Sequence, residues 1–95
     1  MNIAILIGNV VADPDVKRYD SSTVCRMRLA VDKDYSEGAD YLPVTCFGKT
    51  AEICEQYVRE GKKILVKGRN TSGSYEKDGK KIYTYEIIAD NITFL

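Results

Sequence analysis

The side chains best suited to chemistry in this chain are flat rings and cations. The 95 residues include seven tyrosines but no tryptophan and no histidine. Ring faces that stack on bases, beside cations that attract phosphates, are what a single-stranded nucleic acid requires. Aromatic residues also favour strands for packing reasons alone, so composition leaves both interpretations open. The rings at the edges of predicted strands, with the cations near them, are Tyr35, Tyr41 and Tyr75, and Lys33, Arg69 and Lys77.

Catalytic groups are scarce in the same sequence. Without histidine, no Ser or Cys nucleophile has its usual base. The carboxylates are scattered over predicted loops and a helix at spacings that suggest no acid–base pair, although the sequence leaves open a pair assembled only by folding. Gly48-Lys49-Thr50 is similar to the end of a phosphate-binding loop, but that motif requires glycine where this chain has Pro43. We therefore expect a binding protein without cofactor, not an enzyme.

Size, charge and cysteine content narrow the class further. A chain of 95 residues suits one domain, expected over residues 1–95. Fourteen Lys and Arg balance fourteen Asp and Glu, so attraction for nucleic acid has to come from locally clustered cations. Cys25, Cys46 and Cys54 have apolar or β-branched neighbours and predict buried, reduced thiols of a cytosolic protein. The apolar start, residues 3–7, is far too short for a membrane span, so we expect no membrane association.

Strand-like patterns alternate with turn signals along the chain. Arg26 and Arg28 alternate with apolar residues and predict a strand with one buried and one basic face. That basic face either covers a binding groove or protects an exposed sheet, and both interpretations stay open. Asp78-Gly79 is typical of a tight hairpin turn. Strands are predicted over residues 2–11, 24–31, 41–47, 64–69 and 82–95.

One helix interrupts these strands. Thr50 is predicted to cap a helix from Ala51 to about Glu60, with Tyr57 on its buried face and Gly61 as its stop. Three strands, one helix and two strands is the order of an all-β fold, the five-stranded OB-fold Greek-key barrel with one helix between strands three and four. The strand face and loops of that barrel commonly bind oligonucleotides.

Short segments in nearly every predicted element form one pattern. They are Met1-Asn2, Ile5-Leu6-Ile7-Gly8, Asp13-Pro14, Leu29-Ala30-Val31, Phe47-Gly48-Lys49-Thr50-Ala51-Glu52, Tyr57, Gly61, Val66-Lys67-Gly68-Arg69, Tyr75, Gly79, Tyr83 and Ala89-Asp90-Asn91-Ile92-Thr93-Phe94-Leu95. With these segments in this order, the whole chain resembles the bacterial single-stranded DNA-binding protein family. The resemblance implies an OB-fold protein that wraps single-stranded DNA in replication, recombination and repair. It also implies self-assembly, usually as a homotetramer, with a dimer as the alternative.

The resemblance implies roles for individual residues as well. Positions that stack bases in the family match Tyr35, Tyr41, Tyr75 and Phe47, and a lysine that contacts the DNA backbone matches Lys49. Tyr57 matches a helix position that faces the core. With the cations of the predicted strands, the expected DNA-binding set is Tyr35, Tyr41, Phe47, Tyr75, Lys49, Arg28, Lys33, Lys67, Arg69 and Lys77.

The chain also departs from the family pattern. Basic residues common in the family are replaced by Asn9, Ala12 and the segment 71–74, which predicts fewer phosphate contacts and a shallow salt dependence. The sequence stops at Leu95, before the flexible acidic tail with which the family recruits partner proteins, so tail-mediated partners are not expected. A shortened sequence and a tailless relative carried by a phage or mobile element are both open. The rival functions are a primosomal-type dimeric adaptor that binds DNA weakly and a structural oligomerisation module.

Overall fold

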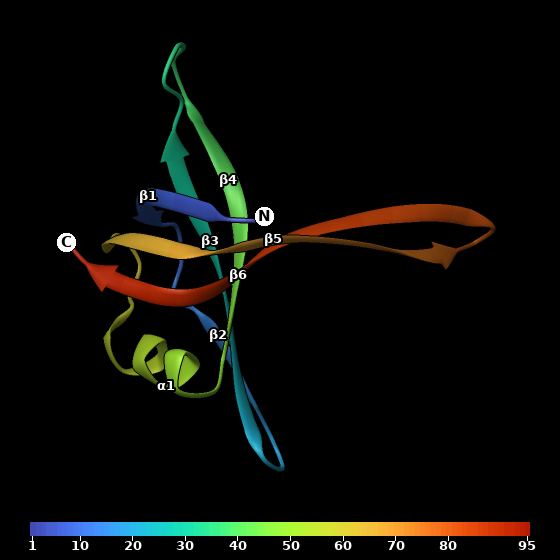
Figure 1. The fold of residues 1–95 in the computed structure, drawn as a ribbon, viewed down its shortest axis with the longest axis horizontal. Helices are drawn as coiled ribbons and strands as arrows, with labels where there is room; N and C mark the ends of the chain where they lie inside the picture. Colours follow the sequence, from blue (N-terminus) through green and yellow to red (C-terminus); the bar gives the residue numbers. More distant parts are fainter.

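The structure is a computed structural model that describes residues 1–95, and it contains six strands and one helix (Figure 1). No helix in it combines the length and apolar character needed to cross a bilayer. In chain order the elements are β1 (Ala4–Val10), β2 (Asp15–Tyr19), β3 (Ser22–Asp32), β4 (Ala39–Phe47), α1 (Gly48–Tyr57), β5 (Lys63–Lys77) and β6 (Lys80–Phe94).

Five of the strands close into a barrel. β1 pairs with β5, β5 with β6, and β4 with β3, all antiparallel, while β4 and β6 pair in parallel. A short contact of β1 with β3 at Asn9 and Val10 completes the ring. The helix α1 lies between β4 and β5 in the chain and packs against β3, β4 and β6. This closed sheet with one helix confirms the predicted all-β OB fold.

The barrel core follows the predicted alternation. Along β3 the side chains of Cys25, Met27 and Leu29 are buried, while Arg26 and Arg28 point outward and are exposed. Cys25, Cys46 and Cys54 are fully buried and unbridged, as the apolar neighbours predicted. The largest fully buried side chains come from β3, β5 and β6 and are Leu29, Ile64 and Ile87.

β5 and β6 continue far beyond the barrel as a two-stranded arm (Figure 1). The sequence predicted strand four only to Arg69, but β5 runs to Lys77. Both faces of the arm are open to solvent, so its residues show no apolar alternation, and pairing with β6 alone maintains the strand. At the arm tip Asp78 and Gly79 have φ of 54° and 76°, which confirms the predicted hairpin turn.

Two elements differ from the expectation near the helix and before β3. β2 was missed because its residues, Asp15–Tyr19, are mostly polar and exposed, and it pairs only with β3. The helix begins at Gly48 rather than Ala51, since Gly48 has a φ of 59° that turns β4 directly into α1. Phe47 therefore takes the N-cap position predicted for Thr50 and supplies no side-chain cap.

The observed helix also corrects the role of Tyr57. α1 ends at Tyr57 rather than Glu60, and its buried residues are Ala51 and Cys54, followed by the buried Val58 just beyond the helix. Tyr57 lies beside this stripe and is 61% exposed, with an edge contact to Phe94 at 6.1 Å between ring centroids. The prediction that Tyr57 belongs to the core is wrong.

Candidate nucleic-acid interface

Strand register places two rings and two arginines on one face of the β3–β4 sheet. Residues directly opposite in an antiparallel pair project to the same side. Cys25 and Cys46 form such a pair and point into the core, so the neighbouring pairs point outward. These outward pairs, named here the outer face, are Val24 with Phe47, Arg26 with Thr45, Arg28 with Pro43, and Ala30 with Tyr41.

The outer face continues from the barrel onto the arm. Thr45 of β4 is opposite Ile88 of β6, and Thr45 Oγ1 donates a 2.8 Å hydrogen bond to Glu86 Oε2, two residues along β6. Every second residue of β6 projects to the same face, so this face continues from Glu86 to Ile82. Ile82 is opposite Tyr75 of β5. The ring of Tyr75 thus shares the outer face with Tyr41 and Phe47.

All three rings of the outer face are accessible. Tyr41, Phe47 and Tyr75 are 59%, 46% and 52% exposed, although each is large and apolar enough to favour burial. An exposed ring on a sheet keeps a flat surface available for stacking, which is the mode by which single strands are held without sequence preference. The outer face therefore offers stacking positions on both the barrel and the arm.

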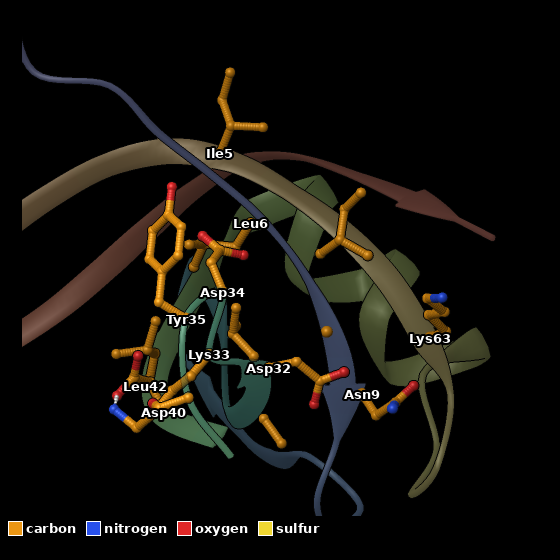
Figure 2. Close-up of a pocket in the computed structure, with 15 residues that line it drawn as sticks. Ile5, Leu6, Asn9, Asp32, Lys33, Asp34, Tyr35, Asp40, Leu42 and Lys63 are labelled. Carbon is orange, nitrogen blue, oxygen red and sulfur yellow. Dashed lines mark hydrogen bonds and ion pairs between the residues drawn. The ribbon is translucent and has the colours of Figure 1, made fainter. Parts of the chain in front are cut away.

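Tyr35 stands apart from these rings, in the loop that joins β3 to β4. Its side chain is fully exposed and borders a cleft of about 760 Å³ between this loop and β1 (Figure 2). The loop is closed by the Lys33 N–H, which donates to Gly38 O at 3.1 Å, and by an ion pair between Lys33 Nζ and Asp40 Oδ1 at 2.6 Å. The cleft lining contains Asp32, Asp34 and Asp40 against two lysines, so its charge does not favour phosphate.

The predicted cations are not all equally placed. Arg28 is exposed on the outer face, Lys49 is exposed on the first turn of α1 just beyond Phe47, and Lys77 is at the arm tip. Lys33 is paired with Asp40, and Arg69 Nη1 lies 3.7 Å from Asp90 Oδ1, so part of their charge is offset.

Lys67 lies on another part of the surface than the outer face. Lys67 is opposite Ile5 of β1 and Asn91 of β6, on the outside of the β1–β5–β6 part of the barrel. Arg26 is not in the expected DNA-binding set, but it lies on the outer face. Its alternation with Arg28 along the sequence could have indicated this position. Tyr83 and Tyr85 were also absent, and they are exposed on the arm.

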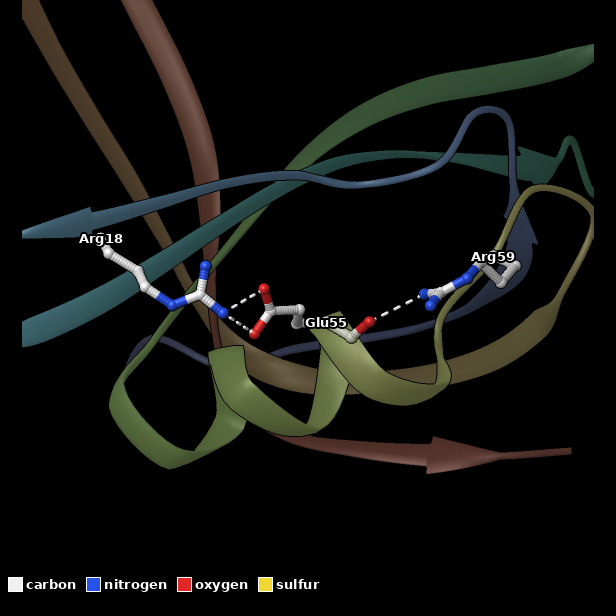
Figure 3. A network of polar contacts seen from close by, with 3 residues as sticks. All are labelled: Arg18, Glu55 and Arg59. Atoms are coloured by element: carbon white, nitrogen blue, oxygen red, sulfur yellow. Dashed lines mark hydrogen bonds and ion pairs between the residues drawn. The ribbon is translucent and has the colours of Figure 1, made fainter.

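A polar network ties β2 to the helix that follows the outer face (Figure 3). Arg18 Nη2 of β2 contacts both carboxylate oxygens of Glu55 on α1. Arg59 Nη1 donates to Glu55 O at 2.8 Å and to Val58 O at 2.6 Å, and thereby satisfies carbonyls at the C-terminal end of the helix. The network is exposed and structural, and it leaves Lys49 at the opposite end of α1 free to contact a ligand.

The buried thiols are not reactive groups. Cys46 Sγ and Cys54 Sγ lie 3.6 Å apart. The hydrogen bond with Cys54, followed by burial, raises the pKa of Cys25 far above 9.0. The hydrogen bond with Cys25 lowers the pKa of Cys54, but the hydrogen bond with Cys46 and burial outweigh it and raise that pKa to about 12. Since the thiolate is the nucleophile, these cysteines belong to the core and not to a site.

Comparison with known proteins agrees with this geometry. A 40% identical relative, a single-stranded DNA-binding protein of Fusobacterium nucleatum, matches 99% of this chain, and the chain spans 66% of that protein, just under two thirds. Single-stranded DNA-binding protein 2 of Clostridium acetobutylicum is 37% identical over the whole chain and 77% of its own length. The single-stranded DNA-binding protein of Clostridium tetani is 39% identical over the whole chain and 70% of its own length. The pattern of the single-strand binding protein family matches residues 1–95, and the protein belongs to that family.

Proposed function

We propose that this protein binds single-stranded DNA, with little dependence on base sequence, by stacking bases on the outer face. The observation that carries the proposal is the shared face of Tyr41, Phe47 and Tyr75, all exposed and beside Arg26 and Arg28. Membership of the family and the names of its relatives support the same ligand. Stacking tolerates any base because every base has a flat ring, so no hydrogen-bond code is required.

Phosphate contacts supplement the stacking in this proposal. Arg28, Lys49 and Lys77 are the cations best placed to follow a strand along the outer face, with Tyr35 as an additional ring at the end of the sheet. Lys33, Arg69 and Lys67 are weaker candidates, since two are ion-paired and one lies elsewhere on the barrel. Such binding would protect single strands during replication, recombination and repair in the bacterial cytosol.

Alanine variants of the rings test this mechanism. Tyr41→Ala and Tyr75→Ala should each weaken binding of a thymine-rich oligonucleotide by about 1 to 3 kcal/mol, the usual loss for one stacked base. Tyr57→Ala is the matched control, because Tyr57 is as exposed as Tyr41, at 61% against 59%, but lies on α1 outside the outer face. Binding is measured by fluorescence anisotropy of a labelled strand, and circular dichroism verifies the fold.

The control separates stacking from a general effect of losing a tyrosine. Tyr57→Ala should bind within about twofold of the parent, a change below 0.5 kcal/mol on the usual free-energy scale. If Tyr41→Ala and Tyr75→Ala also bind like the parent, the rings of the outer face do not stack bases.

A further inference from the structure

The arm carries a second set of rings on the side opposite Tyr75. In the β5–β6 register Ser74 is opposite Tyr83 and Ser72 is opposite Tyr85, one step out of phase with the pair of Tyr75 and Ile82. Because successive residues of a strand point to opposite faces, Tyr83 and Tyr85 project from the reverse face of the arm. They are 75% and 45% exposed, and the serines opposite them are too small to cover the rings.

The spacing of these two rings suits a nucleobase. Residues two apart on a strand are separated by roughly 6.6 to 6.8 Å. Stacked bases are about 3.4 Å apart along a DNA strand, so one base fits between two such rings with a stacking contact on each side. Tyr83 and Tyr85 are two residues apart on β6, so their backbone positions leave room for one base between the rings.

Hydrogen bonds at the arm root hold one of the rings in place. Tyr85 OH donates to Asn70 Oδ1 at 2.7 Å. Asn70 is in turn held by Asn2, through Asn70 N to Asn2 Oδ1 at 2.9 Å and Asn2 Nδ2 to Asn70 O at 2.7 Å. A ring already fixed in its binding position loses less conformational entropy when a ligand stacks on it.

Cations around the tip of the arm favour a nucleic acid over an apolar protein segment. Lys81 follows the same face, opposite Glu76, and its Nζ lies 5.5 Å from the centroid of the Tyr83 ring. Lys77 and Lys80 are opposite each other beside the turn and project to the outer side, so cations lie on both sides of the arm tip. Rings interleaved with cations are the combination that single-strand sites use.

We propose that the reverse face of the arm, formed by Tyr83, Tyr85 and Lys81, is a second stacking site for single-stranded DNA. The inference rests on the proposed function, because the DNA strand that contacts Tyr75 on the outer face is the one that continues to Tyr83 and Tyr85. The arm then lies between two stretches of the same DNA strand. It extends the site of each subunit without enlarging the barrel.

The double variant Tyr83→Ala/Tyr85→Ala tests the second site with two ligands. A thymine-rich oligonucleotide of about 8 nucleotides, within the range covered by one OB fold, is short enough to occupy the outer face alone. It should bind the double variant within about twofold of the parent. Poly(dT) should bind the variant about fivefold or more weakly, with an occluded length shorter by about one nucleotide, since the base held between the two rings is released.

Controls distinguish this inference from its alternatives. Tyr83→Phe keeps the ring and should bind poly(dT) like the parent, which shows that the ring and not the hydroxyl is used. The inference is overturned if the double variant keeps the parent's occluded length and poly(dT) affinity, or if short and long ligands lose affinity equally. A changed oligomeric state in light scattering would also overturn it, because the reverse face would then be a subunit contact. If the parent itself fails to bind the short oligonucleotide, the proposed function is wrong and the second site falls with it.

Discussion

At the residue scale, the rings that matter are distinguished by where the backbone places them. The sequence predicted exposed rings at Tyr35, Tyr41 and Tyr75, because each lies at the edge of a strand or in a loop. It did not separate Tyr57 from the buried stripe of the helix: Ala51 and Cys54 are buried as predicted, but Tyr57, the last helical residue, is exposed. The outer face itself required the register of β3, β4 and β6, which sequence patterns do not supply.

The buried thiols make the free energy of unfolding depend on pH in the alkaline range. In the folded protein the pKa of Cys54 is raised from 9.0 to about 12. Below pH 9 the Cys54 thiol is protonated in the folded and the unfolded protein, so its full contribution to the free energy of unfolding is present there. Between pH 9 and 12 the unfolded chain releases a proton that the folded chain retains, so the free energy of unfolding falls as pH rises.

Urea unfolding at several pH values checks this response. The parent should lose about 1.4 kcal/mol per pH unit for each such thiol above pH 9. Cys54→Ala should lose stability less steeply over the same range, and comparing the two slopes cancels the ionisation of tyrosines and lysines. Identical slopes would mean that Cys54 ionises in the folded protein as freely as in the unfolded chain.

At the scale of elements, the arm depends on a close crossing where it leaves the barrel. The β5–β6 register shifts between Lys67 and Gly68, as in a β-bulge. A Cβ atom on Gly68 would lie 1.9 Å from the carbonyl oxygen of Ile88, so only glycine fits there. Further along β5, a Cβ atom on Gly73 would meet only the Thr84 hydroxyl, at 3.2 Å, and that side chain can rotate away.

These two glycines give a matched pair of variants on one strand. Gly68→Ala should lower the free energy of unfolding by about 1 to 3 kcal/mol or more, since backbone has to move. Gly73→Ala should be neutral or stabilise by up to about 1 kcal/mol, because alanine is favoured over glycine in a strand. Denaturant midpoints measure both. Equal losses at the two positions would show that the crossing at Gly68 is not tight.

The elements predicted from sequence are those with one buried face. Alternation of apolar and polar residues identified the barrel strands and their order, and Asp78-Gly79 identified the hairpin turn. β2 and the outer half of β5 carry no such alternation, because neither has a face in the core. Their strand structure comes from pairing with β3 and β6, which is a tertiary contact invisible in the local pattern.

At the scale of the whole molecule, β1 offers a surface for self-association. Residues 4–8 pair only with β5, so their other edge is open. Ile5 and Ile7 of this strand, and Ile3 just before it, are 61%, 48% and 52% exposed. An open edge beside an apolar stripe is a surface that a symmetric partner can cover.

We expect light scattering to show an oligomer, with four subunits as the family resemblance implies. Ile5→Lys should reduce the subunit number, because it places a charge in the middle of the apolar stripe. Ile53→Lys is the control, since Ile53 is 45% exposed on α1 and should leave assembly unchanged. A strictly monomeric parent at micromolar concentration would contradict the role given to β1, and a dimer would favour the adaptor function.

We propose that stacking on the outer face, more than charge, holds single-stranded DNA on this protein. The chain has no net charge, and two of its predicted cations are ion-paired, so few phosphates can be neutralised. A duplex keeps its bases stacked on one another and offers mainly phosphates to such a surface. The protein should therefore prefer a single strand strongly and lose little affinity in salt.

Titration of the protein with a thymine-rich oligonucleotide and with a duplex of equal length, at about 50 and 200 mM salt, distinguishes stacking from charge. We expect the single strand to bind at least tenfold more tightly than the duplex at both salt concentrations. Its affinity should fall by much less than the roughly 1,000-fold that about 6 phosphate contacts would cost over this range. Equal binding of the two ligands, or a loss of that size in salt, would contradict the account.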